Sequence, residues 1–361
     1  MSHVLTDEQL SILKELLLTN SPSGCEKQTI QFLNRQLSPA CDTFTDALGN
    51  LYIRHGNSHG LKVMVTAHAD EVGFQVVFID KNGFVYARLI AGVDAQTIPG
   101  SVVVSVNSQI SITGVIGKKS PHVLEGDEKK SLPKIWDLWI DFGFDSDAEA
   151  GQYIKCGDYL VLQSSLYTSI NGNKIISKAL DNKIGLFIML EVFRRLSGTS
   201  LPIDLTGVAT VQEELGSRGA FVAANRVKPD IAICLDVGVA TDIPSMQNQR
   251  FGSFELGKGP GLVYNADNNE LLVKSLIKTA ERESIPYQQT TGFRPSGGTE
   301  LYMVRMADLG IATANISIPN RYMHSLVEMC DLSDVASAIE LLYAELFELS
   351  TYNKDDFCLF S

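Results

Sequence analysis

Five residues with metal-binding side chains lie at or just after strand-like or loop segments of the chain. They are two histidines and three carboxylates: His68, Asp181, Glu214, Asp236 and His324. Three of them directly follow apolar runs, and in open α/β sheets the carboxyl ends of strands are where sites assemble. Nitrogen and oxygen ligands without thiolate suit Zn, Co or Mn. The set is balanced for two divalent metals, with one carboxylate bridging them.

The first ligand segment, residues 63–73 (VMVTAHADEVG), shows the pattern most clearly. A β-rich apolar run ends in His68, and Asp70 follows two residues later. A histidine with a carboxylate close by is a common arrangement around a metal. Gly73 then loosens the backbone. The segment is therefore expected to deliver a ligand to the edge of a sheet.

Each candidate also has an ordinary structural explanation. A histidine after a strand is commonly a core or surface residue. Asp181 precedes a helical pattern, where a carboxylate is commonly an N-cap. Glu213 and Glu214 are adjacent, as in a solvated turn. Only Asp236, which follows a buried-type strand, requires a partner by its position. The case for a site therefore depends on all of the segments together.

Composition excludes several classes of protein. The chain has 361 residues, 45% hydrophobic and 20% charged, with a net charge of −12. This charge argues against nucleic-acid binding, and the length favours two domains. The six cysteines form no C-x-x-C pair, so free thiols in a reducing cytosol are expected. No signal peptide and no run of about 20 apolar residues is visible. A cytoplasmic protein without a membrane partner is the expectation.

Periodicity divides the chain into two parts with different secondary-structure patterns. Residues 1–71 and 167–361 alternate helical and strand-like patterns, which predicts an α/β domain with a mixed, largely parallel sheet sandwiched by helices. Residues 72–166 contain short β-like runs, which predicts an inserted β-barrel-like domain. The expected insert strands are 74–79, 85–90, 102–106, 110–116 and 159–162, with a short helix near 147–153 and a mobile surface loop at 118–134.

Local patterns predict the elements of the α/β part. Thr6 and Gln9 form a capping-box pattern before an apolar stripe, and residues 43–54 look like a hairpin. The expected helices are 184–196, 216–225, 268–284 and 332–349, and the expected strands are 205–211, 231–235 and 311–317.

Seven segments together resemble the tetrahedral (TET) aminopeptidases, cytosolic dinuclear-metal peptidases that include glutamyl and deblocking aminopeptidases. Some relatives were formerly labelled endoglucanases. The matching segments are 67–74 (AHADEVGF), 92–100 (GVDAQTIPG), 178–183 (KALDNK), 212–220 (QEELGSRGA), 236–238 (DVG), 257–260 (GKGP) and 321–325 (RYMHS). They span nearly the whole chain in the family's order.

The resemblance implies a role for each ligand candidate. Asp181 would bridge two divalent metals, of which Zn is the first expectation and Co or Mn the alternatives. His68 and Asp236 would complete one site, and Glu214 and His324 the other. Residues 72–166 would form the dimerisation (apical) domain. Dimers would build a hollow homododecamer that trims the N-terminal residues of short peptides.

Two further residues would act on the substrate or on a ligand. Glu213 would be the general base, because a water activated by two metals still needs a carboxylate that is not a ligand to take its proton. Asp70 would orient His68, because a carboxylate on the distal imidazole nitrogen fixes the tautomer and raises ligand basicity.

Four positions depart from the family pattern, and none is a ligand. Relatives often have Trp where Val93 precedes Asp94, and they usually have Asp where this chain has Glu300. The Pro common after the last ligand motif is absent, and Lys183 replaces a more usual Arg. Because Glu300 lies near the expected side-chain pocket, substrate preference is left open. Whether Glu300 or Arg294 lines that pocket is a question for the structure.

Three other functions compete with the aminopeptidase. A metal-dependent amidase or deacylase acting on N-acyl amino acids would use the same centre. A glycosidase would need two carboxylates on opposite sides of one bond, which the adjacent Glu213 and Glu214 supply poorly. An assembly protein with a degenerate site would not need the seven catalytic and ligand positions that are intact here.

Overall fold

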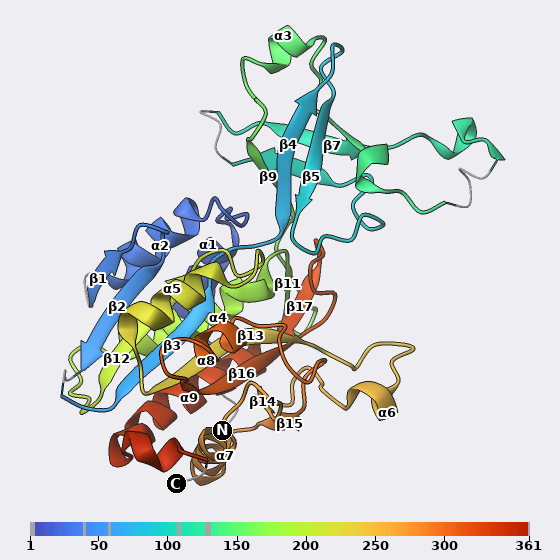
Figure 1. The fold of residues 1–361 in the computed structure, drawn as a ribbon. Helices are drawn as coiled ribbons and strands as arrows, with labels where there is room; N and C mark the ends of the chain where they lie inside the picture. Colours follow the sequence, from blue (N-terminus) through green and yellow to red (C-terminus); the bar gives the residue numbers. More distant parts are fainter. Residues whose placement is uncertain (1–3, 39–40, 57–58, 107–109, 127–130, 360–361) are drawn as a thin grey trace.

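An eight-stranded mixed sheet forms the centre of the larger part of the molecule (Figure 1). The computed structural model describes residues 4–38, 41–56, 59–106, 110–126 and 131–359. The strand order is β1 (Asp42–Thr45), β2 (Leu51–Gly56), β12 (Asp204–Thr210), β3 (Lys62–His68), β13 (Ile231–Val239), β16 (Ala312–Asn320), β14 (Gly261–Val263) and β15 (Gln288–Thr290). The middle four strands are parallel and buried on both faces, as expected for near-continuous apolar runs.

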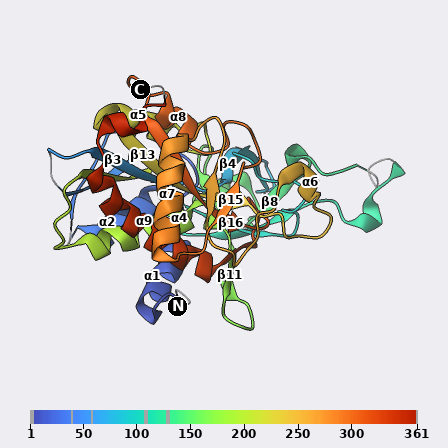
Figure 2. The same ribbon diagram turned by 90° about the horizontal axis from the view of Figure 1, so that it is seen from below.

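Helices cover both faces of this sheet (Figures 1 and 2). One face packs in the main hydrophobic core against α1 (Asp7–Leu17), α2 (Lys27–Leu37), α4 (Leu180–Leu196), α7 (Glu270–Glu283) and α9 (Leu332–Glu348). The other face packs in a smaller core against α5 (Arg218–Val227) and α8 (Leu301–Arg305). The short α6 (Asn248–Phe251) projects from the body (Figure 1). In the part of the chain that the structure describes, no helix is long and apolar enough to cross a bilayer.

A closed barrel stands on one side of the sheet domain (Figure 1). Its strand order is β4 (Gly73–Ile79), β5 (Val85–Ile90), β8 (Trp139–Asp141), β7 (Thr113–Gly117), β6 (Val102–Ser105) and β9 (Tyr159–Leu162). It has a separate hydrophobic core. The predicted fold class, a largely parallel sheet between helices with a barrel-like insert, is confirmed. The domain limits at 72 and 166 stay a prediction.

Six short strands were not anticipated from the sequence: β14 and β15 at the edge of the large sheet, and four others in two further places. A three-stranded antiparallel sheet joins β10 (Tyr167–Thr168), β11 (Lys174–Ser177) and β17 (Glu328–Asp331), and β8 closes the barrel with only three residues. These strands have two to four residues, too few to establish an alternating pattern. Strand β11 of this small sheet ends at Ser177, shortly before Asp181.

The capping box and the hairpin predicted near the N-terminus are confirmed. The Thr6 hydroxyl accepts the Gln9 N–H and the Gln9 side chain accepts the Thr6 N–H, and β1 pairs with β2 as a hairpin. The expected loop 118–134 contains residues 127–130, which lie outside the described part. The short helix expected near 147–153 is α3, which spans only Asp147–Ala150, and the described residues also form 3-10 turns at Pro121–Val123, Ile135–Asp137, Leu349–Thr351 and Lys354–Phe357.

Replacing Glu345 with Gln is expected to stabilise the protein at high pH. Glu345 on α9 is 0% exposed and accepts a hydrogen bond from the Thr279 hydroxyl on α7 (2.6 Å). Burial raises the pKa of its carboxyl from 4.5 to about 7. The folded protein therefore favours the protonated form, and stability is lost as pH rises between these two values. At about 1.4 kcal/mol per pH unit, the cost approaches about 3 kcal/mol at pH 8.

Thermal unfolding at pH 5.5 and pH 8 measures this effect. The melting temperature of the Glu345→Gln variant should exceed that of the wild type clearly at pH 8 and less at pH 5.5. Glu15→Gln, on the exposed side of α1, is the control and should change neither value. An equal gain at both pH values would contradict the assignment.

Candidate metal centre

The sheet register brings the carboxyl ends of the central strands together. Thr210 of β12 pairs with His68 of β3, so residues following β12 emerge beside His68. On the other side, the last pair of β3 and β13 is Thr66 with Cys234. His68 and Asp236 each lie two residues beyond this pair, where the two strands no longer pair. The sheet therefore opens at the place where these side chains lie.

Asp181 lies between two groups of potential ligands. Its Oδ1 is 3.0 Å from His68 Nε2, and its Oδ2 is 3.3 Å from His324 Nε2. His68 Nε2 is also 3.8 Å from Asp236 Oδ1, and His324 Nε2 is 3.1 Å from Glu214 Oε1. Within each group the ligand atoms lie within 4.8 Å of one another. The five predicted ligand positions thus converge as two triads that share one carboxylate.

The distal nitrogen of each histidine faces a main-chain carbonyl. His68 Nδ1 is 3.1 Å from the Asp70 oxygen, and His324 Nδ1 is 3.2 Å from the Gly92 oxygen. A hydrogen bond from Nδ1–H to a carbonyl leaves Nε2 as the lone-pair nitrogen. Both Nε2 atoms point into the triads, and with Nδ1–H donated to the carbonyl each would be free to bind a metal.

The Asp70 carboxylate has closer partners than the imidazole beside it. Its Oδ1 is 3.5 Å from His68 Nδ1. It accepts the main-chain N–H groups of Glu213 (2.9 Å) and Glu214 (3.0 Å), one on each oxygen. Asp70 is fully buried. It therefore holds the turn that carries Glu213 and Glu214, a contact that the sequence did not predict, besides lying against His68.

Negative charge accumulates in this buried region. Burial, against the opposing charge of His68 and together with the charges of Glu214, Asp70 and Asp181, raises the pKa of Glu213 to about 8. Burial and the neighbouring charges of Asp181 and Glu213 also raise the pKa of Asp236. Ionised carboxylates without compensating cations are costly in such a place. The donor set and its charge therefore fit divalent cations.

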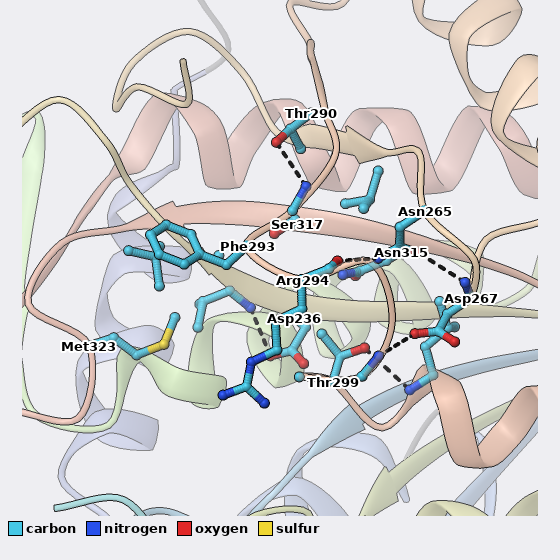
Figure 3. A pocket seen from close by; sticks show the side chains of 18 of the residues that line it. Asp236, Asn265, Asp267, Thr290, Phe293, Arg294, Thr299, Asn315, Ser317 and Met323 are labelled. Carbon is cyan, nitrogen blue, oxygen red and sulfur yellow. Dashed lines mark hydrogen bonds between the residues drawn. The ribbon is translucent and has the colours of Figure 1, made fainter. Parts of the chain in front are cut away.

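A cavity of about 500 Å³ is lined in part by the triads, and Figure 3 shows side chains that line it, Asp236 among them. Glu213 lines it together with the five ligand candidates. Phe293, which stacks on Phe251 at 4.7 Å, and the exposed Arg294 also line the cavity. Among the described lining residues, Arg294 is the only lysine or arginine. The lining therefore combines the carboxylates of the triads with one permanent cation.

Glu300 does not line this cavity. It is 0% exposed and lies at the start of α8, where its Oε2 accepts the Thr210 hydroxyl at 2.5 Å. Its neighbours Arg294, Gly297, Gly298 and Thr299 do line the cavity. Of the two candidates for the substrate pocket, Arg294 is therefore the one that faces this cavity, and its role in substrate preference stays a prediction.

Replacing Gly92 with Ala is expected to weaken metal binding at the triad of His324. A Cβ at residue 92 would lie 2.8 Å from His324 Nδ1, too close for an unshifted ring. The methyl group would displace the imidazole and break its hydrogen bond to the Gly92 carbonyl. Loss of such an orienting contact typically weakens metal affinity by about 10- to 100-fold. Titration of metal-free protein with Zn²⁺ against a chromophoric chelator measures it. Unchanged affinity for both equivalents would contradict the prediction.

Some contacts at the site were not predicted from the sequence. Gly92, which opens the matched segment 92–100, and Glu328 of β17, which lies in no matched segment, both contact His324. Asn315 on β16 lines the cavity, is 4% exposed, and has no hydrogen-bond partner for Oδ1 among the described residues. Each lies outside the ligand motifs or has a contact that only the fold creates.

An α/β sheet that gathers two histidines and several carboxylates at its carboxyl edge defines a metal-binding hydrolase class. Comparison with known families agrees, because the family described as M42 glutamyl aminopeptidase matches residues 49–341. The chain belongs to this family and is therefore a peptidase hydrolase. M42 peptidases are metal-dependent.

Relatives and solved structures cover nearly the whole chain. It is 31% identical to the putative aminopeptidase FrvX of Escherichia coli over 97% of this chain and 98% of that protein. It is 33% identical to the lysyl aminopeptidase of Pyrococcus furiosus over 94% and 96%.

The structural neighbours include TET peptidases. A TET aminopeptidase from a marine sediment Thaumarchaeota archaeon superposes with a TM-score of 0.90 at 32% identity, covering 96% of this chain and 98% of that chain. The TET1 peptidase of Pyrococcus horikoshii, which can assemble into a tetrahedron or a large octahedral shell, superposes with a TM-score of 0.84 at 29% identity, covering 94% and 99%.

Proposed function

We propose that the protein is a dinuclear metal-dependent aminopeptidase that removes N-terminal residues from short peptides. The observation that carries this proposal is the pair of triads that share Asp181, with Glu213 lining the same cavity and belonging to neither triad. His68, Asp181 and Asp236 would hold one metal. Asp181, Glu214 and His324 would hold the other. Zn is the preferred metal and Co or Mn the alternatives, because the donors are imidazole and carboxylate.

The reaction requires a proton carrier besides the metals. Two divalent ions would supply Lewis-acid activation of a water and of the scissile carbonyl. Glu213 then takes the proton of the attacking water and delivers it to the leaving amine. The Asp70 carboxylate keeps Glu213 in place through its main-chain N–H, and the Ser217 hydroxyl donates to Glu213 Oε1 (3.2 Å). Asp70 thus fixes the main chain of Glu213, and Ser217 orients its carboxylate.

The free α-amine of the substrate would bind at one of the two metals. The family match favours the aminopeptidase over the amidase or deacylase, because the relatives include a lysyl and a glutamyl aminopeptidase. The side chain of the first residue would extend toward Phe293 and Arg294.

Assembly and location belong to the same proposal. The TET1 peptidase of Pyrococcus horikoshii assembles into closed shells, and we expect this chain to form a homododecamer built from dimers through the barrel. Static light scattering would measure the mass. A cytoplasmic site of action is the matching expectation.

Peptides with free and acetylated N-termini test the proposed function directly. The metal-reconstituted protein should release the N-terminal residue of the free peptides only, and a chelator should abolish this activity. Hydrolysis restricted to the acetylated substrates would establish the amidase. Activity on a soluble glucan that survives metal removal would revive the glycosidase, and absence of bound metal would favour the assembly protein. A scan of the N-terminal residue would then show how Arg294 affects preference.

A further inference from the structure

Glu328 joins two segments that carry predicted metal ligands. It opens β17, is 2% exposed and pairs with Ser177 at the end of β11. The chain runs from Ser177 to Asp181 in four residues, and His324 precedes Glu328 by four residues on the other side. The small sheet therefore places the Glu328 side chain between the two ligand segments.

Each carboxylate oxygen of Glu328 accepts a main-chain N–H from a different ligand. Oε2 accepts the N–H of Asp181 (2.8 Å), and Oε1 accepts the N–H of His324 (2.9 Å). The Asn320 side-chain amide also donates to Oε2 (3.2 Å). One carboxylate thus links the start of α4, the end of β16 and the loop of His324.

The backbone of both segments needs such support. Ala179, two residues before Asp181, has φ of 56°, and His324 has φ of 62°. Residues other than glycine rarely adopt this left-handed conformation, and they keep it only where surrounding contacts hold them there. The hydrogen bonds that the main-chain N–H groups of Asp181 and His324 donate to Glu328 are contacts of this kind.

Glu328 forms no ion pair with any residue that the structure describes, so charge pairing does not explain its burial. The nearby ammonium groups of Lys178 and Lys183 bind the Glu71 carboxylate at 2.5 and 3.0 Å. Among described residues the hydrogen bonds of Glu328 come from two main-chain N–H groups and one amide. Only a carboxylate presents two acceptor oxygens to two N–H groups, since a glutamine amide turns a donor toward one of them.

The geometry points to Glu328 as a positioning residue that holds Asp181 and His324 in place before a metal binds. This inference rests on the proposed metal-dependent function. The triad of Asp181, Glu214 and His324 depends on Glu328 for two of its three ligands, whereas the triad of His68 depends on it for Asp181 alone. Metal affinity at the first of these triads should therefore depend most on Glu328.

Glu328→Gln tests the inference, with Glu345→Gln as matched control because Glu345 on α9 is another buried glutamate and does not line the cavity. The Glu328→Gln variant should bind its weaker metal equivalent about 10- to 100-fold less tightly in a chelator competition. With Co²⁺ as the probe, its visible absorption spectrum should change. Excess metal should restore kcat with KM little altered. Glu345→Gln should match the wild type in all three measurements.

A measurement on the unmodified protein covers the case in which the variant does not fold. In metal-free wild-type protein, the amide hydrogens of Asp181 and His324 should exchange slowly, because the Glu328 carboxylate already holds them. Rapid exchange of both, or unchanged metal affinity and spectrum in a folded Glu328→Gln variant, overturns the inference. Failure of the proposed function is distinguishable, since wild-type protein would then bind no metal or release no N-terminal residue.

Discussion

A Glu213→Gln variant is expected to lose about 10²- to 10⁴-fold in kcat on a short peptide, the usual contribution of a general base. Glutamine keeps the size of the side chain and the hydrogen bond from the Ser217 hydroxyl, but it cannot accept a proton from water. Glu213 belongs to neither triad. Bound metal should therefore remain at the wild-type level, and KM should change little.

The adjacent Glu214 provides the sharpest contrast for this experiment. Glu214 Oε1 faces His324 Nε2 in the second triad, so Glu214→Gln should lower metal content as well as kcat. Steady-state kinetics and elemental analysis on both variants separate the two roles. If Glu213→Gln loses metal, or if it retains wild-type kcat at saturating metal, Glu213 is not the general base.

An Asp181→Ala variant is expected to lose both metals and all activity above background, a fall of at least about 10⁶-fold. Asp181 is the only residue common to the two triads. Its two oxygens face different histidines, His68 and His324. Removal of the shared carboxylate therefore damages both sites at once and leaves each with two of its three protein ligands.

His324→Ala is the matched comparison for Asp181→Ala. His324 belongs to one triad only, so its replacement should remove one metal equivalent per chain and leave the other on His68 and its partners. Elemental analysis after gel filtration counts the equivalents. One equivalent retained by Asp181→Ala, or both retained by His324→Ala, would show that the two triads do not share a bridging ligand.

The central strands were predictable because their pattern is local. Parallel strands buried on both faces are almost uniformly apolar, so β12, β13 and β16 stand out in the sequence. The barrel strands β5 and β9 are found at the predicted residues, 85–90 and 159–162. By contrast, β8 and β17 have three and four residues, and the partners of such short strands decide their conformation.

The sequence by itself predicted the donor types of the candidate site and the family of the protein. Residue types at the ends of apolar runs, His68 and Asp236 among them, predicted imidazole and carboxylate donors, and the resemblance of seven segments to the TET aminopeptidases predicted a peptidase, because such patterns are properties of short segments. Which atoms meet was decided by the tertiary structure. Asp70 reaches the N–H groups of Glu213 and Glu214, and Glu328 reaches those of Asp181 and His324. Strand register and crossover connections create these contacts between distant segments, and no local pattern encodes them.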